Sequence, residues 1–182
     1  MTPDTPHGRG GRRPAGWFSR LFGFRPSVDA APFVVPNWWA LDGEAVLARL
    51  PWGMLGLTIC YDLRFPALYR TLAQAGAQYL AVPAAFTRVT GEAHWTTLLR
   101  ARAIEAQCFV FAAGQGGRHE NGRETYGHSL IISPWGEILI EGGSDPGVFA
   151  AEIDAGAVAQ ARSRVPSLTH DRPFRAAAPA TG

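Results

Sequence analysis

Lysine is absent from this sequence of 182 residues, because all 17 of its basic residues are arginine. No side-chain ammonium group is therefore available for catalysis. The arginines are nearly balanced by 15 acidic residues, and the net charge of +2 argues against a dedicated nucleic-acid binder. At this length, and with 47% apolar residues, the chain can form one domain with a hydrophobic core.

Cysteine and long apolar runs are also scarce. The two cysteines, Cys60 and Cys108, form no disulfide framework and lack the paired spacing of a zinc site. No run reaches the ~18 apolar residues of a membrane span. The longest candidate, residues 77–87, is interrupted by Pro83. These absences exclude a membrane-spanning protein and leave no sign of a metal or an organic cofactor.

The composition changes near residue 43. Residues 1–43 carry five Arg against three Asp, are rich in Pro and Gly, and show no helical or strand periodicity. We expect a flexible, solvated leader; an Arg-rich arm that touches nucleic acid is the weaker alternative. The segment lacks the apolar stretch of a secretory or twin-arginine signal, so we expect a cytoplasmic protein. Residues 44–174 form the expected domain, and residues 175–182 a tail.

From residue 44 onward, apolar runs alternate with helical patterns. The strands predicted by these runs are 45–50, 54–60, 78–83, 108–113, 127–133, 137–141 and 147–153. The predicted helices are 66–75, 92–107 and 155–163, the last with Asp154 as its N-cap, and residues 114–125 read as a loop. Pro134-Trp135-Gly136 is expected to turn a hairpin. This order predicts an α/β fold with a mixed sheet.

Cys60 is the first candidate for chemistry, because it ends an apolar run and precedes the polar segment Tyr61–Arg64. A nucleophile at a strand-to-helix turn stands clear of the sheet, and backbone N–H groups at the turn can stabilise an oxyanion. A thiolate is a strong nucleophile when a neighbour activates it. The competing interpretation is a small buried apolar residue. Cys108, followed by Phe-Val-Phe, is expected in the core.

Other polar residues are assigned structural roles. His94, His119, His128 and His170 could each serve a cysteine, but sequence distance pairs none of them with Cys60. Glu105 is expected to pair with Arg102 or Arg100 on one helix. Asp62 and Arg64 are expected to hold the turn after Cys60, through the backbone or through each other.

The segment Gly56-Leu57-Thr58-Ile59-Cys60-Tyr61-Asp62-Leu63-Arg64-Phe65-Pro66 closely resembles the nucleophile segment of the nitrilase superfamily, the carbon–nitrogen hydrolases. Further stretches agree in order: Pro83–Phe86, Thr90–Trp95, Leu98–Glu105, Tyr126–Ser129 and Ser133–Gly136. The resemblance runs from about residue 44 to 174. It is greatest to the Nit-type branch, which includes omega-amidase and deaminated glutathione amidase.

The resemblance implies the C-terminal part of an α-β-β-α sandwich that forms homodimers. It implies hydrolysis of a small-molecule amide or nitrile through a thioester, without metal or cofactor. Cys60 matches the family's nucleophile, and the backbone N–H of Tyr61 matches an oxyanion donor.

The chain departs from the family pattern before Cys60. The family places a general-base Glu and a Lys upstream of its cysteine, whereas this chain has Glu44 and no lysine there. Glu44 lies in the strand preceding the nucleophile strand, so neither role is assigned. We therefore expect a truncated family member with impaired hydrolysis. The alternative is an inactive fragment or pseudoenzyme that acts through dimer-type contacts.

Overall fold

A computed structural model describes residues 44–176 of the chain. The expected leader, residues 1–43, and residues 177–182 of the expected tail lie outside these described residues. The strands are β1 (Val46–Leu50), β2 (Gly53–Leu57), β3 (Tyr79–Ala81), β4 (Phe109–Ala112), β5 (Gly116–Arg118), β6 (Glu124–Tyr126), β7 (Leu130–Ile132) and β8 (Ile138–Glu141). The helices are η1 (Cys60–Arg64, 3₁₀), α2 (Pro66–Gln74), α3 (Arg88–Ala106), α4 (Gly156–Arg164) and η2 (Ser167–Thr169, 3₁₀).

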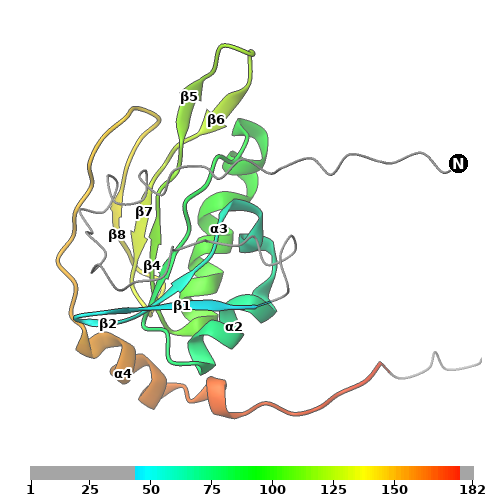
Figure 1. Cartoon of the computed structure of the whole chain (residues 1–182), viewed down its shortest axis with the longest axis vertical. Helices are drawn as coiled ribbons and strands as arrows, with labels where there is room; N and C mark the ends of the chain where they lie inside the picture. The colour runs from blue at the N-terminus through cyan, green and yellow to red at the C-terminus, as the bar shows by residue number, and fades with distance from the viewer. Residues whose placement is uncertain (1–43, 177–182) are drawn as a thin grey trace, which may run out of the picture. The chain divides into compact units, whose positions relative to one another are not determined.

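Six of the strands form one mixed sheet in the order β1-β2-β3-β4-β7-β8 (Figure 1). β2, β3 and β4 run parallel, and the pairs at both sides are antiparallel. Parallel neighbours need a crossover, which α2 and α3 provide. The α/β class with a mixed sheet, expected from the sequence, is confirmed.

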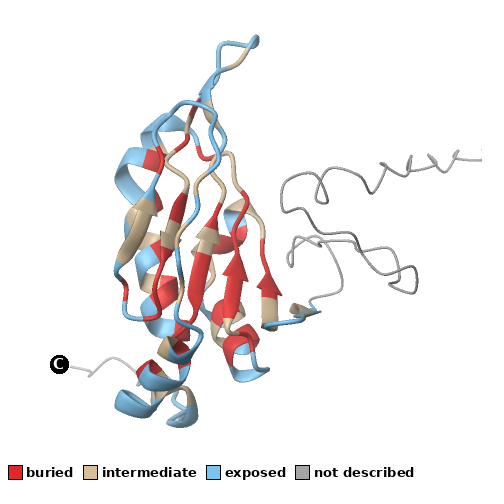
Figure 2. Ribbon diagram, turned by 90° about the vertical axis from the view of Figure 1, so that its left-hand side faces the viewer, coloured by how far each residue is buried: buried red, intermediate tan, exposed pale blue. Residues whose placement is uncertain are grey.

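One face of the sheet is covered by α2 and α3. Their inward side chains, including Leu72, Trp95 and Leu99, pack on Leu80 and Val110 of the two central strands. Pro66 begins α2, where its missing N–H costs nothing. The hydroxyl of Thr87 caps α3 by accepting from the backbone N–H of Thr90. Figure 2 shows that the central strands are the most buried part of the fold.

The opposite face of the sheet carries a second, smaller cluster. Alternation along β3 and β4 turns Tyr79 and Phe109 to this side, where their rings stack with centroids 6.0 Å apart. Val158 of α4 and Ile153 pack against them. Both faces of the central strands are therefore apolar, which explains why these strands read as continuous hydrophobic runs.

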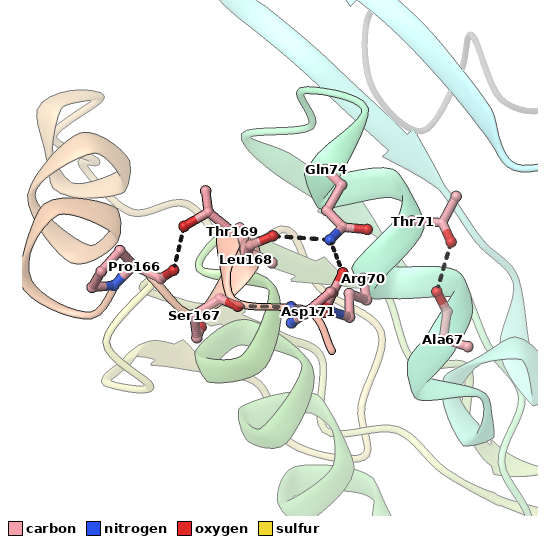
Figure 3. A network of polar contacts seen from close by, with 9 residues as sticks. All are labelled: Ala67, Arg70, Thr71, Gln74, Pro166, Ser167, Leu168, Thr169 and Asp171. Carbon is pink, nitrogen blue, oxygen red and sulfur yellow. Dashed lines mark hydrogen bonds and ion pairs between the residues drawn. The ribbon is translucent and has the colours of Figure 1, made fainter. Parts of the chain in front are cut away.

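The C-terminal segment is fastened to α2 by a polar clasp (Figure 3). Arg70 donates through Nε to Asp171 Oδ1 at 2.8 Å and through Nη2 to the carbonyl oxygen of Ser167 at 2.7 Å. Gln74 donates through Nε2 to Asp171 and to the carbonyl oxygen of Leu168 at 2.9 Å. α2 directly follows the turn that contains Cys60, so the clasp fixes the helix into which that turn leads.

Two predicted elements differ from the structure. Residues 114–125, expected as a loop, contain β5 and most of β6, which pair as a separate two-stranded hairpin. Its strands have three residues each and are Gly-rich or polar, so they show no apolar alternation. Residues 147–153, expected as a strand, are not a strand. Two of their apolar side chains pack instead: Ile153 joins the second cluster, and the Phe149 ring lies against Gly142, whereas Val148 is 99% exposed.

The remaining boundaries shift slightly. α3 begins at Arg88 rather than at residue 92, because the Thr87 cap lies one turn earlier. Ala155, rather than Asp154, is the N-cap of α4, although Asp154 Oδ1 accepts from the Gly156 N–H at 2.7 Å. The hairpin around Pro134-Trp135-Gly136 is confirmed as β7 and β8. Within residues 44–176, no helix is both long and apolar enough to cross a membrane.

Candidate active site

The candidate site lies where the parallel strands β2, β3 and β4 end. Open α/β sheets commonly bind ligands at the carboxyl ends of their strands. Backbone bonds continue the sheet past these ends: the Cys60 N–H donates to the carbonyl oxygen of Pro83, and the Ala84 N–H to that of Ala113, both at 2.9 Å. The Gly114 N–H donates to Ser129 Oγ at 3.0 Å.

Cys60 adopts a left-handed backbone conformation, with φ of +48°. Such a conformation costs a non-glycine residue about 1–3 kcal/mol and is found mainly where the surrounding structure enforces it, often at active sites. Cys60 is the first residue of η1, and its side chain is partly exposed. The chain therefore turns sharply at this residue, as expected from the sequence, and Cys60 is only partly buried where it packs against the main core cluster.

The two residues after Cys60 have different roles in the turn. The Tyr61 N–H lies in the first turn of η1, and no residue between 44 and 176 accepts a hydrogen bond from it. Asp62 is fully buried, and its Oδ2 accepts from the Ile59 N–H at 2.9 Å. Burial raises the pKa of the Asp62 carboxyl. Asp62 thus holds the turn through the backbone, as expected, while the Tyr61 N–H remains available as a donor.

The turn is also anchored from α3 and α2. Arg102 of α3 donates through Nε and Nη2 to the carbonyl oxygen of Leu63, at 3.0 and 2.9 Å. Its Nη1 donates to Glu105 Oε2 at 2.8 Å, which confirms the expected pair on that helix. Tyr69 Oη lies 2.8 Å from Thr58 Oγ1, which donates to the carbonyl oxygen of Ala81.

Arg64, the last residue of η1, lies close to His94 of α3. The Arg64 guanidinium lies over the rings of Tyr61 and Phe86, with Cζ 5.6 and 5.3 Å from the ring centroids. Its Nη1 and Nη2 are each 3.5 Å from His94 Nδ1. Rather than pairing with Asp62, Arg64 places a positive charge four residues from Cys60, and no acid of residues 44–176 forms an ion pair with it.

The other histidines make contacts elsewhere. His128 stacks on Tyr126 with centroids 3.9 Å apart, and its Nδ1 lies 2.7 Å from the Tyr126 carbonyl oxygen. His119 Nε2 lies 2.8 Å from Thr125 Oγ1 in the β5–β6 hairpin. Of the four histidines considered from the sequence, only His94 contacts the turn, and it does so through Arg64. Within the described region, no acid or histidine is hydrogen-bonded to the Cys60 thiol.

Cys108 lies in the core, as expected from its Phe-Val-Phe context, and is fully buried. Burial raises the pKa of its thiol to about 11. Residues 44–176 contain no group of three His, Cys, Asp or Glu side chains that could hold a metal ion.

The sequence analysis missed Arg102, Tyr69 and Thr58 as supports of the turn. Arg102 stood out only through its spacing from Glu105, and that spacing does not reveal that the guanidinium is buried. One signal was present: all three lie in or beside the segments that carry the family resemblance. Partners 39 residues apart, such as Arg102 and Leu63, can be identified only from the tertiary structure.

Comparison with known proteins assigns residues 12–163 to the carbon–nitrogen hydrolase family. This match begins at residue 12, whereas the resemblance expected from the sequence motifs begins at about residue 44. Mouse deaminated glutathione amidase is 51% identical over 125 residues, which cover 69% of this chain. These residues cover 39% of the mouse protein, so the chain spans well under half of that relative.

Two solved structures extend the comparison. Saccharomyces cerevisiae Nit3, a member of branch 10 of the nitrilase superfamily, is similar with a TM-score of 0.67 and 35% identity over 72% of this chain and 48% of Nit3. A mutant amidase from Nesterenkonia sp. AN1 has a TM-score of 0.56 and 30% identity over 72% of this chain and 53% of the amidase. That structure shows Michael addition of acrylamide at the amidase's active site cysteine.

Proposed function

The chain belongs to the carbon–nitrogen hydrolase family, and from this premise we propose that it cleaves the C–N bond of a small-molecule amide through Cys60. Sγ of Cys60 bonds to the carbonyl carbon, and the amine leaves with a proton, which generates a thioester. Water then attacks the thioester, releases a carboxylic acid and restores the thiol.

The left-handed conformation of Cys60 is the observation that supports this proposal best. A φ of +48° at a partly exposed cysteine, enforced by bonds to Pro83 and within η1, is costly for a residue with only a packing role. Cys108 illustrates the packing role, because it is fully buried in the core. Cys60, which is partly exposed and has a left-handed backbone, is therefore the better candidate nucleophile of the two.

Stabilisation of the tetrahedral intermediate is assigned to the Tyr61 N–H. This N–H lies beside Cys60, and no residue between 44 and 176 accepts a hydrogen bond from it, which supports this role. Removing one oxyanion donor costs enzymes about 10²–10³ in rate. A backbone donor held by the turn needs no reorganisation when charge develops on the substrate oxygen.

The proposed activity is weak for this chain. No acid or histidine of residues 44–176 bonds to Cys60, and the sequence contains no lysine. A general base contributes typically 10²–10⁴ in rate. Arg64 carries a nearby positive charge, but a planar guanidinium is not equivalent to an ammonium group. The same observations favour the second candidate function, a family member without catalytic activity that acts through protein contacts.

The test is amide hydrolysis by the purified chain. Short aliphatic amides and dicarboxylic monoamides are offered, and released ammonia is measured together with the intact mass of the protein. We expect an acyl adduct on Cys60 and turnover below the ~1–10³ s⁻¹ of typical enzymes. Cys60→Ala should abolish both, whereas Cys108→Ala should retain them. Hydrolysis that persists in Cys60→Ala would refute the proposed nucleophile, and no adduct with any amide would favour the inactive protein.

Two further expectations from the resemblance stay predictions. Homodimer formation can be measured by size-exclusion chromatography with light scattering, where a monomer over the micromolar range would contradict it. Cytoplasmic location can be measured by fractionating cells that express the chain.

A further inference from the structure

Arg102 is a charged side chain whose bonds are directed at the turn that contains Cys60. Its side chain is 5% exposed, although it lies on a helix with a solvent-facing side. Two of its nitrogens donate to one acceptor, the carbonyl oxygen of Leu63, at 3.0 and 2.9 Å. The third bond goes to Glu105, whose side chain is 55% exposed.

We propose that Arg102 is a positioning residue for the proposed nucleophile: by holding the Leu63 carbonyl it keeps Cys60 and the Tyr61 N–H in the geometry required for acyl transfer. This inference rests on the function proposed above. It adds a residue on α3 that lies 42 positions after the nucleophile and need not touch the substrate.

The argument starts from the shape of η1. The turn has five residues, Cys60–Arg64, and Leu63 lies three positions after Cys60. In a 3₁₀ helix residues three apart lie one turn apart on the same side. Fixing the Leu63 carbonyl therefore sets the rotation of the whole turn, and with it the directions of the Cys60 side chain and the Tyr61 N–H.

The guanidinium also supports the other end of the turn. Its Cζ lies 5.5 Å from the centroid of the Tyr69 ring. Tyr69 Oη is within 2.8 Å of Thr58 Oγ1, and Thr58 precedes Cys60 by two residues. Arg102 thus bonds one side of the turn directly and packs on the residue that holds the other side. The left-handed Cys60 lies between these two supports.

Burying the Arg102 guanidinium costs free energy, which its hydrogen bonds must offset. A buried charge loses hydration and must recover it through hydrogen bonds. Among residues 44–176, only the Glu105 carboxylate forms an ion pair with Arg102, and the Glu105 side chain is 55% exposed. An apolar side chain could fill the same volume, but the Leu63 carbonyl would then lose both donors. The planar, forked guanidinium supplies two parallel N–H groups, which a lysine cannot.

The experiment compares four versions of the 182-residue chain. They are the unaltered chain, Arg102→Met, Arg102→Lys and the matched control Arg100→Met. Arg100 lies on the same helix but donates to the carbonyl oxygen of Gly136 at 2.9 Å, away from the turn. Two rates at Cys60 are followed by peptide mass spectrometry: alkylation by iodoacetamide, and acylation by p-nitrophenyl acetate. Alkylation needs only the thiol, whereas acylation also needs a positioned oxyanion donor.

The informative quantity is the ratio of acylation to alkylation, because a change in thiol exposure or fraction folded affects both rates. Misplacement of reacting groups by about 1 Å can cost about 10² in rate. We expect the ratio to fall by roughly tenfold to a hundredfold in Arg102→Met. Arg102→Lys, with one donor toward Leu63, should recover part of this loss, and Arg100→Met should keep the unaltered ratio. An unchanged ratio in a folded Arg102→Met would overturn the proposal.

Hydrogen exchange separates failure of this inference from failure of the proposed function. The N–H groups of Asp62 and Phe65 donate within the turn, and the N–H of Val82 donates to Phe111 between two strands. If the unaltered chain is not acylated, the proposed function fails, and exchange then decides the role of Arg102. Faster exchange in Arg102→Met than in the unaltered chain at Asp62 and Phe65, but not at Val82, supports it. Exchange that is unchanged at all three amides, or faster by the same factor at all three, refutes it.

Discussion

The indole N–H of Trp95 donates to the carbonyl oxygen of His128 at 2.7 Å. This bond joins α3 to the segment that enters β7, 33 residues further along the chain. Trp95 is 1% exposed and also packs on Phe86 with ring centroids 4.9 Å apart. One side chain therefore fills the core and satisfies a backbone group two residues before β7.

Trp95→Phe should lower the free energy of unfolding, because it removes this donor and leaves the His128 carbonyl without it. Leaving a buried polar group unsatisfied costs about 1–3 kcal/mol, and the smaller ring adds a cavity. Denaturant unfolding followed by circular dichroism measures the change. The control is Trp135→Phe at a residue that is 59% exposed, where we expect a change within about 0.5 kcal/mol. Equal losses in both variants would contradict the role of the bond.

Gly91→Ala should destabilise the contact between α3 and β6. A Cβ atom at Gly91 would lie 2.2 Å from Cβ and 2.3 Å from Cγ of Tyr126, which is too close for two carbon atoms. Overpacking of this kind typically costs about 1–3 kcal/mol. Gly143→Ala is the matched control, because a Cβ there meets no atom within 4 Å. Thermal melts of both variants should show a clear loss for Gly91→Ala only.

The two cysteines should react very differently in the folded chain. Cys60 is partly exposed, whereas Cys108 is fully buried and its thiol pKa is raised to about 11. At pH 7–8 iodoacetamide should label Cys60 alone, and Cys108 should react only after unfolding in denaturant. Mass-spectrometric mapping with Cys60→Ala as the control measures this. Faster labelling of Cys108 under native conditions would exclude Cys60 as the more reactive thiol.

The clasp between α2 and the C-terminal segment should make stability depend on pH at the acid end. Hydrogen bonds from Arg70 and Gln74 lower the pKa of Asp171 below its ordinary value. A carboxyl with a lowered pKa in the folded state stabilises above its unfolded pKa of ~3.9, and this contribution is lost as the pH falls through the folded value.

Asp171→Asn should therefore lower the melting temperature at pH 7, and its difference from the unaltered chain should shrink as the pH falls below about 4. Melting curves between pH 3 and 8 give the comparison. Asp145→Asn is the control, since Asp145 is exposed and forms no ion pair or hydrogen bond with another described residue. A difference between Asp171→Asn and the unaltered chain that is constant across this range would rule out the carboxylate as the cause.

The sequence alone was enough to identify the elements whose signals are local. Tyr79–Ala81 and Phe109–Ala112 are buried on both faces, so they appear as short apolar runs between helices. The Pro134-Trp135-Gly136 turn and the abrupt change of polarity at Cys60 are likewise properties of adjacent residues. The motif at 56–66 was specific enough to indicate the family, which the comparisons confirm.

Only the tertiary structure decided which distant residues meet. Arg102 and Leu63 are 39 residues apart, and Arg70 and Asp171 are 101 apart, so neither pair leaves a periodic trace in the sequence. The same holds for residues 147–153, which the sequence predicts as a strand: Ile153 packs against the second cluster without joining the sheet, and Val148 is 99% exposed. An apolar pattern indicates that some of its side chains are buried. Strand pairing and long-range polar contacts depend instead on which distant segments the fold brings together.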